Sequence, residues 1–319
     1  MTAIESAGAY TPRYRIDADA FRDAWGSFDA PGIERKAVPA ADEDAITMGV
    51  EAAREALAVS THDRDAISGL AIATTTPPVD EGDVAATVAE VLGLDSSIES
   101  AVFTQSTGAS GRALRWAMDV PEGPTLVVTS DAPMGEPDDT RDHAAGAGSV
   151  TLIVAESGPV QIADTATFTQ EFPGTRFRER GASAVDGYDA TAYERDAYST
   201  VVAGAVAELD GSPTVLAPTA PNGKRPYRLA GHVDADVGIS ETANSLGDTG
   251  AASPFFGLLA SWADGHDDVT IVAYGDGASA TAVSVTGTLD ASWDRETVSI
   301  TYAEYARKRG HVVDTGGDR

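Results

Sequence analysis

The chain has 319 residues, 42% of them hydrophobic, with 50 acidic residues against 22 basic ones and a net charge of -28. This length and apolar content suit a globular protein of one large or two mid-sized domains, and the acidity disfavours nucleic acid and anionic membranes as partners. The sequence has no long apolar run and no basic leader followed by an apolar stretch. We therefore expect neither a membrane span nor a signal peptide, and a cytoplasmic protein.

The basic residues are unusual, because lysine occurs only at Lys36, Lys224 and Lys308 while acidic residues are spread along the chain. This pattern is typical of proteins from salt-accumulating halophiles, whose acidic surfaces are screened by concentrated salt. An acidic patch for a basic partner is the alternative, although no block of like charge stands out.

Cysteine is absent from the chain. This absence excludes disulfides, thiolate metal sites and cysteine nucleophiles. The five histidines do not pair at metal-ligand spacing, so we expect no metal site.

Helical and strand patterns alternate along the first half of the chain. Residues 42–57 place Ile46, Val50, Ala53 and Leu57 on one face of a predicted helix, after acidic residues that favour a helix N-terminus. Strands are predicted over 70–76, 98–104, 125–131 and within 144–156, and helices over 82–93 and 109–119.

A second half begins near Gly158 and Pro159 and repeats this order. It contains a predicted helix around 191–209, a strand over 214–219, a turn over 221–226, a loop and helix over 247–265, and a hairpin-like pair over 269–277 and 279–287. We therefore predict an α/β protein in two halves, residues 1–157 and 158–319, packed as pseudo-repeats of one α-β-α-β-α sandwich.

Segments spread over nearly the whole chain resemble, in order, the archaeal hydroxymethylglutaryl-CoA synthase family. They are GAYTPRYRI (8–16), AWG (24–26), GIERKAVPAADEDAITM (32–48), SDAPMGEPDD (130–139), HAAGAGS (143–149), PNGKRP (221–226), LGDTGAASP (246–254), YGDGA (274–278) and ITYAEYARKRGHVV (300–313). The resemblance implies a five-layered thiolase fold, a homodimeric core and a pocket reached by the pantetheine arm of coenzyme A.

The family's catalytic positions carry different residues in this chain. Working synthases use a cysteine that is acylated, a histidine and a glutamate that move protons, and an asparagine that binds the substrate carbonyl. The resemblance places Gln105 at the cysteine, Thr219 at the histidine, Thr75 at the acid/base and Asp248 at the asparagine. A carboxamide cannot form an acyl-enzyme, so covalent thioester chemistry is not expected.

One part of the family's binding site is kept. Lys224 follows Pro221, Asn222 and Gly223 as in the family. The resemblance implies that Lys224, Asn222 and Gly223 lie near a coenzyme A thioester that is not covalently bound. An ordinary exposed turn lysine is the alternative interpretation.

Three functional hypotheses remain open, and whether the protein is an enzyme is one of the open points. The first is a non-catalytic acyl-CoA-binding subunit that partners a zinc-ribbon/OB-fold protein and a thiolase, as the resemblance implies. The second is a diverged acyl-CoA enzyme, a decarboxylase or an acyltransferase, that uses Gln105 or Ser106. The third is a full hydroxymethylglutaryl-CoA synthase.

Overall fold

Two five-stranded units with the same strand order form the centre of the molecule. The computed structural model describes residues 2–120, 123–172, 176–187, 191–234 and 236–311. The first unit runs β1 (Thr2–Tyr10), β7 (Gly148–Ala155), β6 (Thr125–Asp131), β4 (Gly69–Ala73), β5 (Glu99–Phe103). The second runs β8 (Val160–Thr169), β12 (Ser279–Thr286), β11 (Asp268–Gly275), β9 (Val215–Pro218), β10 (Gly238–Ile239).

Strand directions repeat as well as strand order. In each unit the first three strands pair antiparallel with one another, and the last two strands run parallel to the third. A short pairing of β1 with β8, from Thr2 opposite Ile162 to Ile4 opposite Val160, joins the two units into one ten-stranded sheet.

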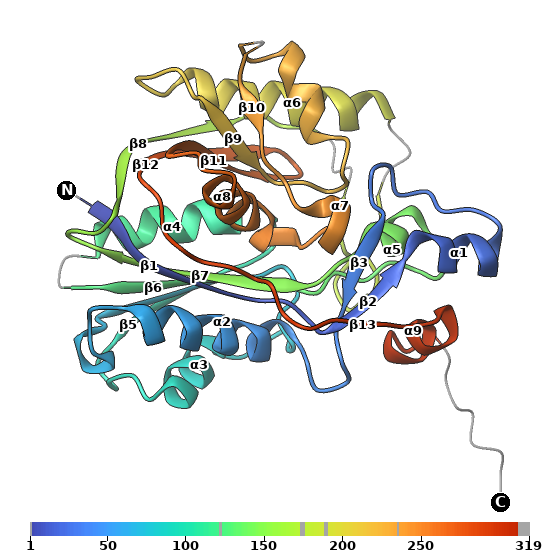
Figure 1. The fold of residues 1–319 in the computed structure, drawn as a ribbon, viewed down its shortest axis with the longest axis horizontal. Coiled ribbons are helices and arrows are strands. Elements are labelled where there is room, and N and C mark those ends of the chain that lie inside the picture. Colours follow the sequence, from blue (N-terminus) through green and yellow to red (C-terminus); the bar gives the residue numbers. More distant parts are fainter. Residues whose placement is uncertain (1, 121–122, 173–175, 188–190, 235, 312–319) are drawn as a thin grey trace, which may run out of the picture.

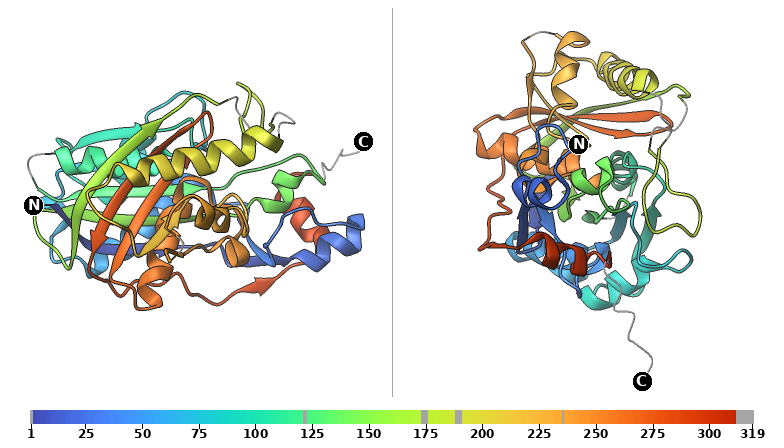
Figure 2. Two further views of the ribbon diagram at one scale, coloured as in Figure 1. Left: turned by 90° about the horizontal axis from the view of Figure 1, so that it is seen from above. Right: turned by 90° about the vertical axis from the view of Figure 1, so that its right-hand side faces the viewer.

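Helices cover both faces of each unit and complete the layers (Figure 1). The helices α2 (Ala45–Val59) and α3 (Val84–Leu92) lie outside the first unit, and α6 (Thr191–Ala207) lies outside the second. Between the units lie α4 (Ala109–Asp119) and α8 (Ser253–Ala263). The two views of Figure 2 show the same stacking, which confirms the predicted α/β sandwich.

Local sequence explains why these elements pack so closely. Helix α2 begins at a capping box in which the Asp44 carboxylate accepts hydrogen bonds from the Ile46 and Thr47 amides at 2.9 and 2.8 Å. Its other end lies directly on β1, because a side chain at Gly8 would come within 2.3 Å of the Ala56 amide nitrogen. The absence of that side chain lets helix and strand touch through their backbones.

A small lobe sits at one end of the sandwich, away from the N-terminus (Figures 1 and 2). It contains the sheet β13 (Val298–Ser299), β2 (Tyr14–Asp17), β3 (Arg35–Val38) and the helices α1 (Ala18–Trp25), α5 (Thr140–Ala144) and α9 (Tyr302–Lys308). Of the short helices, α7 (Ala243–Leu246) packs on β3, η2 (Pro226–Gly231) packs on α6 and η3 (Gly250–Ala252) packs on β6, while η1 (Arg64–Ala66) follows α2.

The lobe is held by a buried lysine. Lys36 of β3 is 1% exposed, and its ammonium donates to the carbonyl of Asp142 on α5 and to the hydroxyl of Tyr305 on α9, at 2.9 Å for the latter. The Tyr305 hydroxyl donates in turn to Oδ1 of Asp142 at 2.5 Å. Burial lowers the pKa of Lys36 to about 7.

The described residues contain no helix with both the length and the apolar character needed to cross a bilayer.

Candidate functional site

A buried carboxylate ties together the carboxyl ends of two strands. Asp131 ends β6 and is 0% exposed. Its oxygens accept six hydrogen bonds: from the hydroxyls of Thr74, Thr75 and Thr76 (each 2.9 Å) and from the amides of Thr75 (2.6 Å), Thr76 (3.0 Å) and Ala251 (2.7 Å). Burial raises the pKa of Asp131, against the opposing effect of these hydrogen bonds. Thr75, which the resemblance predicts at the acid/base position, therefore donates hydrogen bonds to this carboxylate.

Gln105, which the resemblance predicts at the nucleophile position, lies in the turn between β5 and α4. Gln105 has a φ of 72°, a left-handed conformation that few residues other than glycine adopt, and it is exposed. The next two hydroxyls bond to backbone: Ser106 Oγ accepts from the Gly108 amide at 3.2 Å, and Thr107 Oγ1 donates to the Tyr274 carbonyl at 2.7 Å. Neither contact supplies a base that would activate a hydroxyl.

Thr219, which the resemblance predicts at the histidine position, also bonds to backbone. Thr219, 2% exposed, accepts a hydrogen bond on Oγ1 from the Tyr274 amide at 2.9 Å, and its carbonyl accepts from the Tyr198 hydroxyl at 2.8 Å. The backbone of Tyr274 thus lies between Thr219 and Thr107. The structure therefore brings the turn that contains Gln105 and the predicted histidine position, Thr219, together at the end of β11.

The fourth position, Asp248, carries an ion pair. Its side chain is 7% exposed; Oδ1 accepts from the Gly250 amide at 2.9 Å, and Oδ2 pairs with the guanidinium of Arg176. Burial alone would lower the pKa of Arg176, but the carboxylates of Asp248, Asp276 and Asp131 raise it. An arginine thus pairs with the residue that the resemblance predicts at the asparagine position.

Arg176 belongs to a segment that spans the site, residues 176–187, which we name the strap. Arg178 of the strap donates to the Thr75 carbonyl at 2.9 Å, and the Val185 amide donates to the Met134 carbonyl at 2.8 Å. The strap is therefore fixed to the first half through these bonds and to the Asp248 region through Arg176.

A cavity of about 320 Å³ opens beside the strap. The cavity is lined by α5, η2, the loop over 29–31 and the strap, and it includes Asp248 but none of Gln105, Thr75 and Thr219. Its charged lining consists of Arg141, Arg176, Arg225 and Arg228 together with Asp29, Asp248 and Asp276. In a chain of net charge -28, this excess of arginine makes the cavity a place for an anionic ligand.

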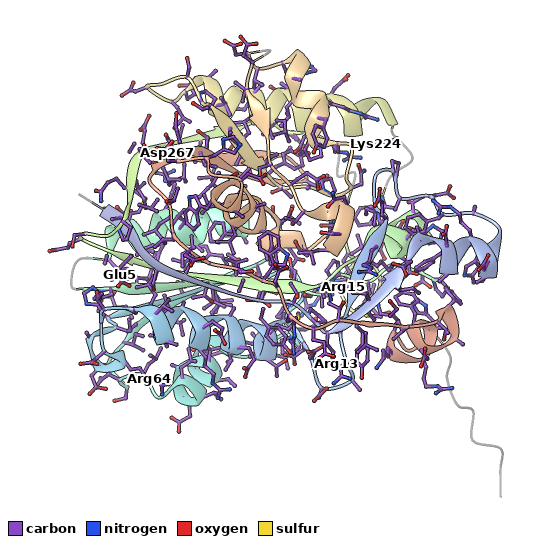
Figure 3. The ribbon with its side chains drawn as sticks, viewed as in Figure 1. Glu5, Arg13, Arg15, Arg64, Lys224 and Asp267 are labelled. Carbon is purple, nitrogen blue, oxygen red and sulfur yellow. The ribbon has the colours of Figure 1, made fainter. Side chains whose placement is uncertain are left out.

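The turn that the resemblance assigns to coenzyme A borders this cavity. Asn222 lines the cavity, and its Oδ1 accepts from the amides of Lys224 and Arg225 at 3.0 and 2.9 Å. Gly223 packs on Gly32, where a side chain would come within 2.3 Å of the Gly32 carbonyl oxygen. Lys224 is exposed, does not line the cavity and lies where the second half meets the lobe (Figure 3).

Among the residues that the structure describes, no group of three or more histidine, cysteine, aspartate or glutamate side chains can hold a metal ion. The buried histidine, His143, belongs to the lobe, where its Nδ1 accepts from the Asp29 amide at 2.9 Å. What the site offers is a charged, arginine-rich cavity.

Sequence reasoning did not single out Arg176, Asp131 and Asp276. The signal for Asp131 was its place at the end of a buried strand, where polar side chains meet those of the neighbouring strand. Arg176 opens a run of three arginines over 176–180, but nothing in the sequence indicates that this run folds back onto Asp248.

No family model matches the chain, but individual proteins do. The hydroxymethylglutaryl-CoA synthase of Pyrococcus furiosus is 36% identical over 164 residues, which are 50% of this chain and 47% of that protein. The hydroxymethylglutaryl-CoA synthase of Archaeoglobus fulgidus is 28% identical over 309 residues, which cover 89% of each chain.

Solved structures agree on the fold. A crystal structure of HMG-CoA synthase complexed with CoA superposes with a TM-score of 0.85 at 18% identity, covering 96% of this chain and 90% of that one. The chain is thus similar in sequence to archaeal hydroxymethylglutaryl-CoA synthases, and it has the thiolase-like fold of a solved HMG-CoA synthase.

Proposed function

We propose that the protein binds a coenzyme A thioester in the arginine-lined cavity without forming an acyl-enzyme, and that it acts as a non-catalytic subunit. The observation that carries this proposal is the cavity lining, which includes the Arg176–Asp248 pair but not the exposed Gln105. The chain has no cysteine, and the hydroxyls of Ser106 and Thr107 bond to backbone, so none of these residues supplies an activated nucleophile.

The charges and the neighbouring turn support the nature of the ligand. Guanidinium groups bind phosphate oxygens through paired N–H donors, and Arg225 and Arg228 stand at the cavity beside Asn222. The solved HMG-CoA synthase with the same fold is complexed with CoA. Coenzyme A carries several phosphate charges, so this wall suits its nucleotide end.

Two other functions would need a different arrangement. A decarboxylase or acyltransferase that uses Gln105 or Ser106 needs that residue to reach the ligand. A synthase needs a nucleophile and a base. Detection of a condensation product from acetyl-CoA and acetoacetyl-CoA, or of free CoA released by turnover, would establish one of them instead.

We predict that the protein binds CoA thioesters without becoming acylated, so its mass does not change. After incubation with acetyl-CoA, intact mass spectrometry should show no acetyl adduct, while calorimetry should show binding. Arg225→Gln should weaken that binding roughly tenfold, because one charge-assisted contact is lost. Arg64→Gln, a change on the far side of the molecule (Figure 3), is the matched control and should bind as the unchanged protein does.

We further propose that the protein forms a homodimer. This homodimer partners a zinc-ribbon/OB-fold protein and a thiolase subunit. The edge strand β5 supports the homodimer, because among the described residues no strand pairs with its outer edge and Val102 on it is 39% exposed. The basis for the other two partners is the resemblance to the archaeal family.

Purification of the tagged protein from its native host at high salt should recover these partners, identified by mass spectrometry. A lysine substituted for Val102 should shift the isolated protein from dimer to monomer in light scattering, because it places charge on the edge. Recovery of a homodimer without a zinc-ribbon companion would remove that partner from the proposal. A monomeric unchanged protein would remove the homodimer.

A further inference from the structure

A second cavity lies beside α7 and α8, and we name it the acidic groove. Its volume is about 660 Å³, and it is bounded by α7, the C-terminal end of α8 and the connection that follows β12 (Figure 1). Among the described residues no basic side chain lines it, whereas four carboxylates do: Glu241, Asp264, Asp290 and Asp294. Its charge is therefore opposite to that of the arginine-lined cavity.

The negative charge of the acidic groove is not balanced by the protein. None of its four carboxylates forms an ion pair with a basic side chain that the structure describes. Helix α8 adds to this charge, because a helix carries partial negative charge at its C-terminal end and α8 has no basic residue in its last turn. Burial raises the pKa of Glu241, as expected for a carboxylate without a cation beside it. The acidic groove therefore favours a cation.

Two tryptophans also line the acidic groove. Trp293 is half-buried, with its ring nearly perpendicular to that of Phe256, and the face of an indole ring attracts cations. Trp262 is 6% exposed, and its Nε1–H has no acceptor among the described residues. A buried donor without an acceptor costs free energy, so a ligand that brings a carbonyl oxygen to Trp262 gains affinity.

These properties together favour an arginine side chain that belongs to a peptide. A guanidinium group is planar, stacks on an indole ring, donates paired hydrogen bonds to carboxylates and is more weakly hydrated than an ammonium group. The peptide carbonyls beside it supply the acceptor that Nε1 of Trp262 lacks. A second copy of this chain is a poor source of that arginine, because it would bring a net charge of -28 to an acidic surface.

We propose that the acidic groove binds an arginine side chain from an exposed segment of a partner protein. The proposal does not depend on which ligand occupies the arginine-lined cavity. It also uses elements other than the edge strand β5, so it does not depend on the homodimer.

Nuclear magnetic resonance of the indole N–H groups tests this proposal, because two of the four tryptophans line the acidic groove. The probe is the blocked tripeptide acetyl-Gly-Arg-Gly-amide, and its partner probe has citrulline in place of arginine, which keeps the shape and the carbonyls but not the charge. The arginine tripeptide should shift the signals of Trp262 and Trp293. The signals of Trp25 and Trp116, which do not line the groove, should stay in place. The citrulline tripeptide should bind roughly tenfold more weakly.

Two variants separate the contribution of charge from that of the aromatic ring. Asp290→Asn combined with Asp294→Asn should weaken binding of the arginine tripeptide roughly tenfold, and both side chains are exposed, so the fold should be kept. Asp267→Asn, at an exposed aspartate that does not line the groove, is the matched control. Trp293→Leu should weaken the arginine tripeptide about two- to fivefold and leave the citrulline tripeptide unchanged. Thermal unfolding shows whether each variant folds.

Three results would overturn the proposal. Equal affinity for the two tripeptides, or unmoved signals of Trp262 and Trp293, would show that the groove does not recognise a peptide arginine. If butylguanidinium, which has the charge but no carbonyl, bound as tightly as the arginine tripeptide, the groove would be a site for a free organic cation. Unchanged affinity in the folded double variant at Asp290 and Asp294 would place the peptide elsewhere on the surface.

Discussion

Asp131→Ala should lower the free energy of unfolding by about 3–5 kcal/mol, because it removes the buried carboxylate that accepts six hydrogen bonds. The hydroxyls and amides that now surround this carboxylate would be left buried without an acceptor. They come from the ends of β4 and from η3, so the loss would loosen the junction between the strand ends and the strap. Denaturant unfolding followed by circular dichroism measures the effect.

Two companion variants make this prediction specific. Asp131→Asn keeps the shape of the side chain but points an amide NH₂ at hydrogen-bond donors. It should therefore lower the free energy of unfolding by roughly half as much as Asp131→Ala does. Asp267→Asn is an exposed change far from the site (Figure 3) and should leave the unfolding midpoint in place. An unchanged midpoint in Asp131→Ala would show that these hydrogen bonds do not hold the strand ends together.

We expect the free energy of unfolding of the unchanged protein to rise between pH 7 and pH 9.5, and Lys36→Met should abolish this rise. The pKa of Lys36 falls from 10.5 in the unfolded chain to about 7 in the folded one. Between these values the unfolded chain holds the proton and the folded protein does not, so raising the pH favours the folded state. At about 1.4 kcal/mol per pKa unit, this window contributes on the order of 3 kcal/mol.

Other titratable groups near Lys36 do not cancel this trend. The groups that face it or its partners are Asp29, Asp138, Asp142, Glu136, His143, His311, Tyr302, Tyr305 and Arg309. Burial lowers the pKa of both histidines, so they titrate below the window, and it raises the pKa of Tyr302 and Tyr305, which titrate above it. Lys224→Met, at an exposed lysine, is the control and should keep the rise. Persistence of the full rise in Lys36→Met would assign it to another group.

Regular elements of the fold were predictable because their sequence patterns are local. The helix predicted over 109–119 is α4, and the one predicted over 42–57 begins at Ala45, where the Asp44 capping box sets its start. The strand predicted over 70–76 ends at Ala73, because the three following threonines bond to Asp131 instead of extending the ladder. Strand β8 was not predicted, since its residues 160–169 alternate between polar and small side chains without a strong apolar face.

The sequence indicated several residues of the candidate site but not the contacts between them. The positions of Gln105, Thr219, Thr75 and Asp248 followed from the family resemblance, and their assignment as degenerate catalytic positions remains a prediction. What no local pattern could reveal was the pairing of Arg176 with Asp248, which are 72 residues apart in sequence. Such a contact depends on the path of the strap, which is fixed by bonds to Thr75 and Met134 far away in the chain.

The backbone contact between Gly32 and Gly223 has a consequence for selectivity. A Cβ at Gly32 would come within 2.7 Å of the Gly223 carbonyl, and one at Gly223 would come closer still to Gly32. These glycines adjoin the cavity-lining residues Pro31 and Asn222. The width of the cavity on that side is therefore set by contact between two backbone segments. Substitution of nearby side chains will change the charges that a ligand contacts more readily than the size of the ligand that fits.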